Sequence, residues 1–408
     1  MQNVAVIGAG ASGLVAAYFA ALNNNRVTVF EKNEKSGKKI YITGKGRCNV
    51  THNCSPEEFL NNVVNNSKFL TGAIYAFSPE RCVQFFENGG LPLKEERGAR
   101  YFPVSDKASD VTKCLEKYCK NLGVNFNFCE QVEKITVLHS TMSDIITNKG
   151  SYSFDKVIVC TGGISYPSTG STGDGYKFAE SVGHSVIDLK PALCGLNLKG
   201  SYYKNLQGLS IKNVKLYVFN DNKLLNEFFG EMLFTHFGVS GPIVLSASSI
   251  INRLDLNKIK LVLDLKPALS VEQLNKRILR DFEQYKNKSI YNCLKELLPF
   301  AIIEEVLKRS NILPEIQVNS VTRNQRQSLL TTIKNFDMIV ASLRDFSEAI
   351  VTSGGVNVKE INPKTMESKL IKGLYFCGEV LDLDAFTGGY NLQIAFSTGY
   401  AAGSSIKN

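Results

Sequence analysis

The chain opens with short apolar runs separated by a glycine-rich turn. Val4 to Ile7 is an apolar run of strand length, Leu14 to Leu22 is an Ala-rich run of helix length, and Val27 to Phe30 is a second short apolar run. The turn over Gly8 to Gly13 separates the first two runs. Strand, helix and strand in this order predict a βαβ unit with parallel strands and a right-handed crossover.

Helix and strand signals continue to alternate up to about residue 190. Ser78-Pro79 predicts the start of a helix, and Ser109 predicts the N-cap of a helix that ends near Gly123. A further helix is expected from Asp174 to just before Gly183. Apolar runs predict strands at 124–128, 132–138, 145–146, 152–154 and 157–160.

The pattern changes near residue 190. Ile211 to Phe219 alternates apolar and polar residues, Asp221-Asn222 resembles a hairpin tip, and the apolar spacing becomes helical from Ser270. The α/β pattern returns beyond about residue 340, with Leu374 to Cys377 as a strand. We therefore predict an α/β fold in which a Rossmann-like domain is split in sequence. Its parts are residues 1–190 and 341–408, and residues 191–340 form an inserted β-barrel-like plus helical domain.

Composition and charge narrow the class of protein. The 408 residues are 44% hydrophobic and 21% charged, which excludes a disordered, collagen-like or coiled-coil chain. Forty-seven Lys and Arg against 38 Asp and Glu give a net charge of +9. This excess suits an anionic cofactor or substrate and does not by itself argue for nucleic acid.

The sequence gives little support for a membrane protein, a metal site or disulfide bonds. No apolar run approaches the roughly 20 residues that span a bilayer, and no leader peptide precedes the first strand, so we expect a cytoplasmic protein without membrane contact. The ten Cys form no CxxC pair, and the four His do not cluster. We expect reduced thiols and no metal site.

The first candidate motif is Gly8-Ala9-Gly10-Ala11-Ser12-Gly13, followed by Glu31 at the end of the next strand. Gly8 permits a tight turn, Gly10 lets a diphosphate approach the backbone, and Gly13 lets helix and strand pack closely. The diphosphate would lie at the positive end of the helix dipole. Glu31 would accept hydrogen bonds from both ribose hydroxyls and would repel a 2′-phosphate. The motif predicts a dinucleotide other than NADP.

Three further motifs contain glycines. A basic stretch follows Glu31 and includes Lys38, Gly46, Arg47 and Asn49, which we expect to supply N–H groups and Arg47 to phosphates or to a flavin edge; a solvated loop or an RNA patch are the alternatives. Thr161-Gly162-Gly163 follows a strand, where glycines suggest close approach to a ligand.

The fourth motif favours FAD over NAD. Gly378-Glu379 and Asp382 follow a late strand, and Gly388-Gly389 precede a helix expected over about 391–404. Reduction of a flavin builds negative charge at N1 and O2, and a helix N-terminus stabilises that charge. A Rossmann domain that binds only NAD has no need of this C-terminal partner.

These motifs together resemble the bacterial NAD(P)/FAD-dependent oxidoreductase family that includes aminoacetone oxidase and the 3-dehydro-bile-acid reductases. Matching stretches extend from residues 8–13 to 373–403. The resemblance implies a split FAD domain with a barrel-plus-helical insertion. Lys45 and His52 depart from residues common in the family. The motifs and the resemblance place the cofactor contacts at Gly8, Gly10, Ala11, Ser12, Gly13, Glu31, Lys32, Lys38, Gly46, Arg47, Asn49, Val132, Thr161, Gly162, Gly163, Gly378, Glu379, Asp382, Gly389, Tyr390, Asn391 and Leu392.

Four residues are candidates on the substrate side. Arg100 would pair with a carboxylate or polarise a carbonyl, Tyr166 and Tyr390 would donate a proton, and His236 would act as acid or base. Structural packing is the alternative for each of them.

The interpretation is an FAD-dependent oxidoreductase. Hydride transfer through flavin N5 would reduce an activated C=C bond or oxidise a small amine, with NADH, NADPH or O2 as redox partner. A small-molecule substrate is favoured. A flavoprotein that acts on RNA and a non-catalytic redox sensor are the alternatives, and the sequence does not predict an oligomeric state.

Overall fold

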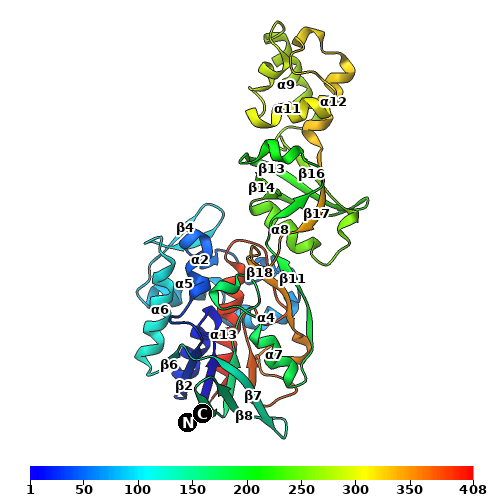
Figure 1. The fold of residues 1–408 in the computed structure, drawn as a ribbon. Coiled ribbons are helices and arrows are strands. Elements are labelled where there is room, and N and C mark those ends of the chain that lie inside the picture. Colours follow the sequence, from blue (N-terminus) through cyan, green and yellow to red (C-terminus); the bar gives the residue numbers. More distant parts are fainter. Residues whose placement is uncertain (408) are drawn as a thin grey trace. The chain divides into compact units, whose positions relative to one another are not determined.

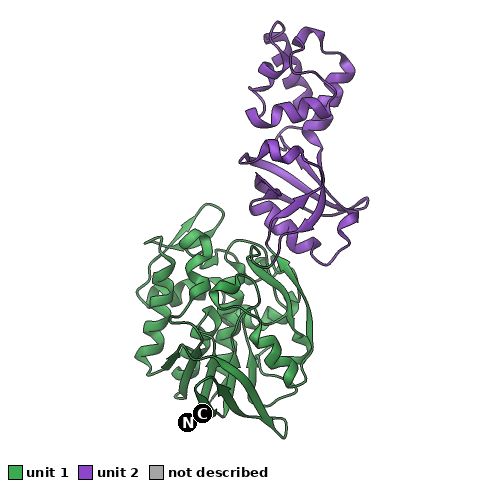
Figure 2. Ribbon diagram, viewed as in Figure 1, with its two compact units in different colours: residues 1–192, 346–408 green, residues 193–345 purple. Residues whose placement is uncertain are grey.

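The computed structural model describes residues 1–407, which form two compact units (Figure 2). Residues 1–192 and 346–408 make unit 1, and residues 193–345 make unit 2. The limits expected from the sequence were 190 and 340. Each unit has its own cluster of buried apolar side chains, and the two clusters share no residue.

Unit 1 is built on a five-stranded parallel sheet (Figure 1). The strand order is β19 (Leu374–Phe376), β10 (Lys156–Val159), β1 (Asn3–Ile7), β2 (Arg26–Glu31) and β6 (Asn125–Phe128). The central strands β1 and β10 are short and almost wholly apolar, as is typical of strands covered on both faces. After β1 the chain continues to β2, which lies on one side of β1, whereas β10 lies on the other side. The strand order therefore reverses at β1, and ligands of such sheets bind at the carboxyl end of the strands at this switch point.

Two helices pack backbone to backbone beside this sheet. They are α1 (Ala11–Leu22) and α13 (Tyr390–Ser405). A Cβ added to Gly399 would lie 2.4 Å from the Ser12 carbonyl oxygen, and one added to Gly403 would lie 2.4 Å from that of Ala16. Glycine at these two positions therefore lets the C-terminal helix approach the first helix of the chain.

The other helices of unit 1 are α2 (Lys38–Ile42), α3 (Pro56–Leu60), α4 (Ser67–Ala76), α5 (Pro79–Asn88), α6 (Ala108–Asn121) and α7 (Asp174–Ser181). Ser78 caps α5 as predicted, with its hydroxyl accepting a hydrogen bond from the Arg81 N–H at 3.2 Å. The predicted Ser109 cap of α6 is wrong, because the helix begins directly after Lys107. A turn ends at Asp106, which has φ of +57°, and the helix therefore begins before Ser109.

Three small antiparallel arrangements complete unit 1. They are β3 (Thr51–His52) with β5 (Arg100–Pro103) and β4 (Leu93–Glu96); β7 (Val132–Leu138) with β8 (Thr141–Thr147) and β9 (Gly150–Ser153); and β11 (Val186–Ala192) with β18 (Val351–Val356).

Unit 2 combines a closed barrel with a helical part (Figure 1). The barrel order is β12 (Leu196–Leu198), β15 (Gly238–Ser240), β14 (Lys223–Thr235), β13 (Ser210–Asn220), β16 (Ile259–Asp264) and β17 (Phe336–Leu343). The helices are α8 (Pro242–Ile251), α9 (Val271–Gln284), α10 (Ile290–Leu294), α11 (Phe300–Arg309) and α12 (Arg323–Lys334). The predicted fold class, a Rossmann-like sheet with a barrel-plus-helical insertion, is confirmed. Among residues 1–407, none of the helices combines the length and apolarity needed to cross a membrane.

Candidate functional site

The three glycines of the first motif occupy three different environments. Gly8 has φ of +104°, and a Cβ there would lie 2.6 Å from the Cys160 carbonyl oxygen. A Cβ on Gly13 would lie 1.9 Å from the Gly8 carbonyl oxygen. Around a Cβ on Gly10 no atom of the described residues lies within 4 Å, and Gly10 is the N-cap of α1. The three glycines therefore have the three roles that the motif requires: Gly8 makes the tight turn, Gly13 allows close packing and Gly10 leaves the approach open. Ala11 and Ser12 lie in the first turn of α1.

The carboxylate of Glu31 is tied to this turn. Its Oε2 accepts the Ala9 N–H at 2.9 Å, and its Oε1 accepts the Asn33 N–H at 2.9 Å. Lys32 forms an ion pair with Asp174 at 2.7 Å, which joins β2 to the start of α7. A buried acid in this place orients the turn and keeps negative charge where ribose hydroxyls bind in such folds.

The basic stretch after β2 is largely paired with carboxylates. Lys38 forms an ion pair with Glu34 at 2.7 Å. Arg47 donates to Glu96 and, through Nε at 2.9 Å, to Asp106. These two carboxylates raise the pKa of Arg47 well above its usual range. The expected phosphate contact of Arg47 therefore stays a prediction that would require it to leave this network.

A charged network joins the second, third and fourth motifs. Lys39 Nζ lies 2.7 Å from Glu379 Oε2 and 2.6 Å from Ser165 Oγ. The Glu379 carboxylate also accepts the Thr352 N–H at 2.9 Å. Gly163 lies against this network, because a Cβ there would meet Thr352 Oγ1 at 2.4 Å. Sequence reasoning missed Lys39, Ser165 and Thr352, although Lys39 adjoins the predicted Lys38.

Gly378 and the start of α13 also lie near the glycine turn. A Cβ on Gly378 would lie 2.5 Å from Ser12 Oγ. Gly389 is the N-cap of α13 with φ of +96°, and a Cβ there would lie 2.9 Å from Asn49 Oδ1. The structure therefore brings motif four beside motif one and the Asn49 end of motif two.

The first turn of α13 is held by polar and aromatic contacts. Tyr390 stacks on His52, with ring centroids 4.7 Å apart. His52 Nδ1 lies 3.2 Å from the Gly388 carbonyl oxygen. Burial raises the pKa of the Tyr390 hydroxyl, which therefore holds its proton. Asn391 bonds to both backbone polar groups of Ala385.

Several buried polar atoms at these motifs have no hydrogen-bond partner among the described residues. They are Ser36 Oγ, Asn49 Oδ1 and Thr161 Oγ1. Buried polar atoms normally find a partner, so an atom without one needs an explanation. All three lie in motifs two and three; a Cβ on Gly389 would lie 2.9 Å from Asn49 Oδ1, and one on Gly175 would lie 2.1 Å from Thr161 Oγ1. The residues present therefore fit a polar ligand such as a dinucleotide.

The remaining predicted residues lie in varied places. Val132 is buried in β7, and Asp382 accepts a hydrogen bond from Asn66 Nδ2 at 2.9 Å. Arg100, on β5, donates to the Arg97 carbonyl oxygen at 3.1 Å. Tyr166 has φ of +50°, an uncommon backbone conformation for a non-glycine residue. Lastly, Thr161 and Leu392 are half-buried, Gly46 has φ of +87° and Gly162 has φ of +71°.

His236 differs from the other candidates because it belongs to unit 2. It lies in the turn between β14 and β15, is exposed, and contacts Phe237 edge to face with centroids 5.1 Å apart.

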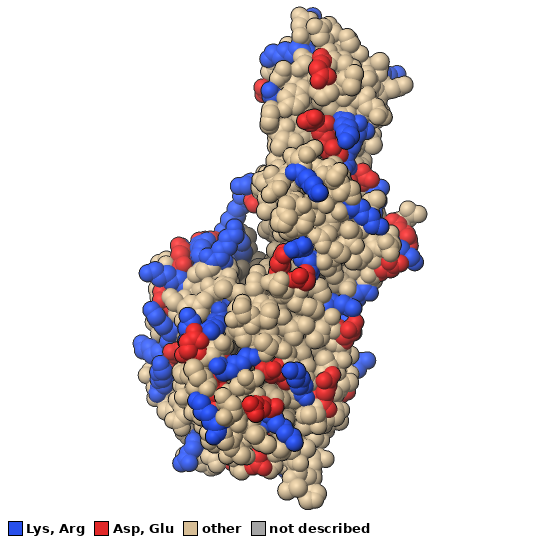
Figure 3. All heavy atoms as spheres, viewed as in Figure 1, with Lys and Arg blue, Asp and Glu red and all other residues tan. Residues whose placement is uncertain are grey.

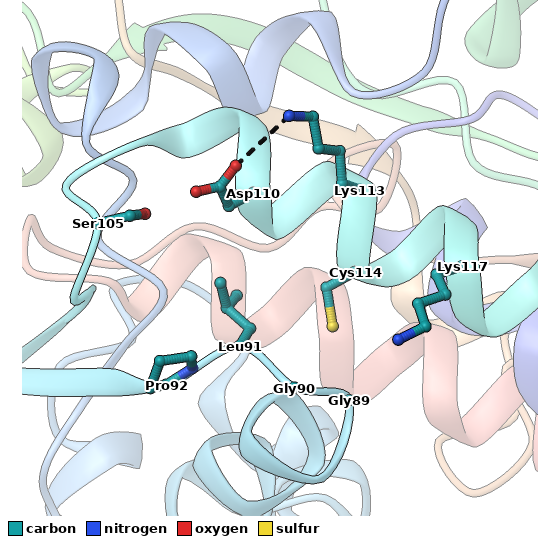
Figure 4. A pocket seen from close by; sticks show the side chains of 9 residues that line it. All are labelled: Gly89, Gly90, Leu91, Pro92, Ser105, Asp110, Lys113, Cys114 and Lys117. Atoms are coloured by element: carbon teal, nitrogen blue, oxygen red, sulfur yellow. Dashed lines mark ion pairs between the residues drawn. The ribbon is translucent and has the colours of Figure 1, made fainter.

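Two cavities of unit 1 lie away from the glycine motifs. The first, of about 280 Å³, is lined by residues 89–92, Ser105 and the α6 side chains Asp110, Lys113, Cys114 and Lys117 (Figure 4). Asp110 and Lys113 form an ion pair at 3.7 Å beside it. The second, of about 420 Å³, is lined by residues 66–69, Val358 and Lys359. Neither contains a predicted site residue.

The described residues include no group of three or more His, Cys, Asp or Glu side chains placed to hold a metal ion. All ten cysteines are free thiols. Cys160 and Cys377, at the ends of β10 and β19, bring their sulfur atoms within 3.2 Å of each other.

Comparison with known proteins identifies the family. Residues 2–405 match the family model described as HI0933-like protein Rossmann domain. The chain belongs to the HI0933-like family. This is a family of FAD-dependent Rossmann proteins, and the resemblance drawn from the motifs is confirmed.

Three relatives that match nearly the whole of this HI0933-like chain carry two different names. A 3-dehydro-bile acid delta(4,6)-reductase of Clostridium scindens is 31% identical over 99% of this chain and 98% of its own length. Ribosomal RNA dihydrouridine synthases of Haemophilus influenzae and Escherichia coli are 31% and 29% identical, over 99% and 97% of this chain and 98% and 96% of theirs.

Solved structures support the fold. The 3-ketosteroid-Δ4-(5α)-dehydrogenase of Rhodococcus jostii RHA1 matches 99% of this chain and 96% of its own with a TM-score of 0.53 and 15% identity. The 3-ketosteroid Δ1-dehydrogenase of Sterolibacterium denitrificans matches 99% of both chains with a TM-score of 0.53 and 12% identity.

Proposed function

We propose that this HI0933-like protein is an FAD-dependent reductase that saturates a C=C bond conjugated to a carbonyl group. The observation that carries the proposal is the pair of activities named for its full-length relatives, at equal identity. A 3-dehydro-bile acid carries a ketone conjugated to its double bonds, and the C5=C6 bond of uridine is conjugated to the C4 carbonyl. Both activities add one hydride and one proton across such a bond.

The four motifs supply the residues that would hold FAD. The glycine turn and the N-terminus of α1 would bind the diphosphate, Glu31 the ribose, and the N-terminus of α13 the pyrimidine edge. Ser36, Asn49 and Thr161 would gain the hydrogen-bond partners that they lack among the described residues. Lys39 and Glu379 would fix the two chain segments that border this site. FAD, when bound, supplies hydride received from NADH or NADPH.

The chain itself must bind the carbonyl and deliver the proton. Arg100 is the proposed carbonyl or carboxylate contact, because its guanidinium can donate two hydrogen bonds in one plane. Tyr166, Tyr390 and His236 are the proposed proton donors. Tyr390 has the best-defined setting, since its ring is fixed against His52 and burial favours its protonated form.

The RNA alternative gains weight from the relatives that act on ribosomal RNA, and the reductase chemistry is common to both substrates. We therefore propose the reaction class for this chain and treat an unsaturated 3-oxo steroid and ribosomal RNA as the two substrate classes to test.

The test is an anaerobic reduction of the purified yellow protein. We expect NADH or NADPH to bleach the flavin, and either a 3-oxo-4,6-diene bile acid or ribosomal RNA from cells lacking this gene to restore the colour with saturation of the substrate. Tyr390→Phe should slow reoxidation by the substrate and leave bleaching unchanged. A colourless protein that takes up no FAD, or a reduced flavin that only O2 reoxidises, would overturn the proposal.

A further inference from the structure

The charge of the chain is concentrated in unit 2. Residues 193–345 contain 21 Lys and Arg against 14 Asp and Glu, a net charge of +7 out of +9 for the whole chain. Within unit 2, the helical part over 265–334 has 12 Lys and Arg against seven Asp and Glu, a net charge of +5. The predicted cofactor contacts all lie outside this part, so FAD does not explain its charge.

The positive side chains gather with aromatic rings along one segment, residues 276–300. We call these residues the α9–α10 surface: Lys276, Arg280, Lys286, Lys288 and Lys295 with Tyr285, Tyr291 and Phe300. Lys288 Nζ lies 4.3 Å from the ring centroid of Tyr285, and Lys295 Nζ lies 5.1 Å from that of Tyr291. Tyr291 in turn contacts Phe300 at 5.7 Å between centroids.

Contacts between α9 and α10 make this segment one piece of structure. Arg277 Nη2 donates to the Glu296 carbonyl oxygen at 3.2 Å, and Cys293 Sγ lies 3.7 Å from the Asp281 carbonyl oxygen. The five cationic side chains of the surface are exposed, and Phe300 is 66% exposed, although it is a large apolar residue. Lys and Arg side chains occur along the face of unit 2 that Figure 3 shows.

Nearby carboxylates leave much of this positive charge unpaired. Asp281 is buried and forms ion pairs with Arg277 at 2.6 Å and with Arg280 at 3.5 Å. Glu283 forms an ion pair with Lys286 at 3.7 Å. Among the described residues, Lys276, Lys288 and Lys295 form no ion pair within 4 Å.

We propose that the α9–α10 surface binds RNA. Lysines that neutralise phosphates and aromatic rings that stack on bases are two elements of single-stranded RNA recognition. Here the lysines lie beside the half-buried rings of Tyr285 and Tyr291, and Phe300 supplies an exposed ring. A steroid with a single carboxylate would not need such a surface. The inference rests on the proposed function and deepens it, because it selects ribosomal RNA as the substrate class.

The test compares two triple variants of the full-length holoprotein by fluorescence anisotropy. One is K286Q/K288Q/K295Q. The matched control, K134Q/K149Q/K177Q, removes the same charge from exposed lysines of unit 1. The probe is fluorescently labelled ribosomal RNA from cells lacking this gene, titrated across a salt series.

We expect the surface variant to bind at least tenfold more weakly near 0.1 M salt. The slope of log K against log salt should fall by about 2, since each lost phosphate contact removes roughly 0.7 to 0.9. The control should keep most of the affinity. Retained yellow colour and an unchanged circular dichroism spectrum show that a variant is folded. Phe300→Ala is a second variant that leaves the charge unchanged and should weaken RNA binding through the loss of stacking.

Three results would overturn the inference: equal losses in both triple variants, no salt-dependent binding by the wild-type protein, or binding to vesicles rich in anionic lipid that depends on these lysines while RNA binding does not. None of these touches the reaction class. If a 3-oxo-4,6-diene bile acid still reoxidised the reduced protein, the proposed function would stand with a small-molecule substrate.

Discussion

Gly10 and Gly13 lie three residues apart in the glycine-rich turn, and glycine is needed at each position for a different reason. A methyl group on Gly13 would collide with the Gly8 carbonyl oxygen, whereas one on Gly10 would project into open space. We expect Gly13→Ala to lower the free energy of unfolding of the apoprotein by about 1–3 kcal/mol through overpacking. Gly10→Ala should change that free energy by less than about 1 kcal/mol.

The same pair separates folding from cofactor binding. Gly10→Ala should weaken FAD binding at least tenfold, about 1.4 kcal/mol, because its methyl group occupies the approach to the helix N-terminus. Urea denaturation of the apoproteins and fluorescence titration with FAD measure the two effects. If Gly10→Ala bound FAD as tightly as the wild type, the diphosphate would not lie at this turn.

His184 gives the fold a pH dependence. Its side chain is buried, with Nδ1 2.9 Å from Glu360 Oε2 and Nε2 2.7 Å from Ser368 Oγ. Burial outweighs the nearby carboxylate and lowers the pKa of His184 below 6.5. As the pH falls below 6.5 the unfolded chain takes up a proton that the folded chain does not, so stability is full above 6.5 and decreases below it.

We therefore expect the free energy of unfolding to decrease as the pH falls from 7.5 to 5.5. His184→Gln should flatten this dependence. His139→Gln, at an exposed position between β7 and β8, is the matched control and should leave it unchanged. An unaltered slope in His184→Gln would show that burial does not govern this histidine.

At the scale of helices and strands, local signals predicted most elements of unit 1. The βαβ start, α7 and α13 follow from apolar spacing and glycine positions, and all are present. The predicted start of α6 was wrong because a turn, and not the Ser109 side chain, determines where this helix begins. Closure of the barrel depends on β12 pairing with β17, where Leu196 faces Leu343, and no local pattern reports a contact so distant in sequence.

The residues of the candidate site also divide into those that the sequence could predict and those that it could not. The glycines could be predicted, since each is required by the backbone around it. The partners of Arg47 could not, because Glu96 and Asp106 come from a separate small sheet and its following turn. The Lys39–Glu379 pair joins the two ends of the split domain, 340 positions apart, and is visible only once the sheet is assembled.

At the scale of the whole molecule, two separate apolar cores predict two unfolding transitions. FAD should raise the midpoint of one transition, that of unit 1, because a ligand stabilises only the structure that binds it. Differential scanning calorimetry with increasing FAD measures both midpoints. Phe336→Ala, in the core of unit 2, should lower only the other transition, by removing a fully buried ring. A single transition that moved as a whole with FAD would contradict this prediction.

The start and the end of the chain lie together (Figure 1). Gln2 Nε2 donates to the Lys407 carbonyl oxygen at 3.2 Å, and Asn25 Nδ2 donates to that of Ile406 at 2.9 Å. They meet at the amino end of β1, whereas the glycine turn lies at its carboxyl end. A short linker could therefore join them in a circular permutant, with new termini at the exposed Asp221–Asn222 hairpin, and an affinity tag on either end would leave the glycine turn clear.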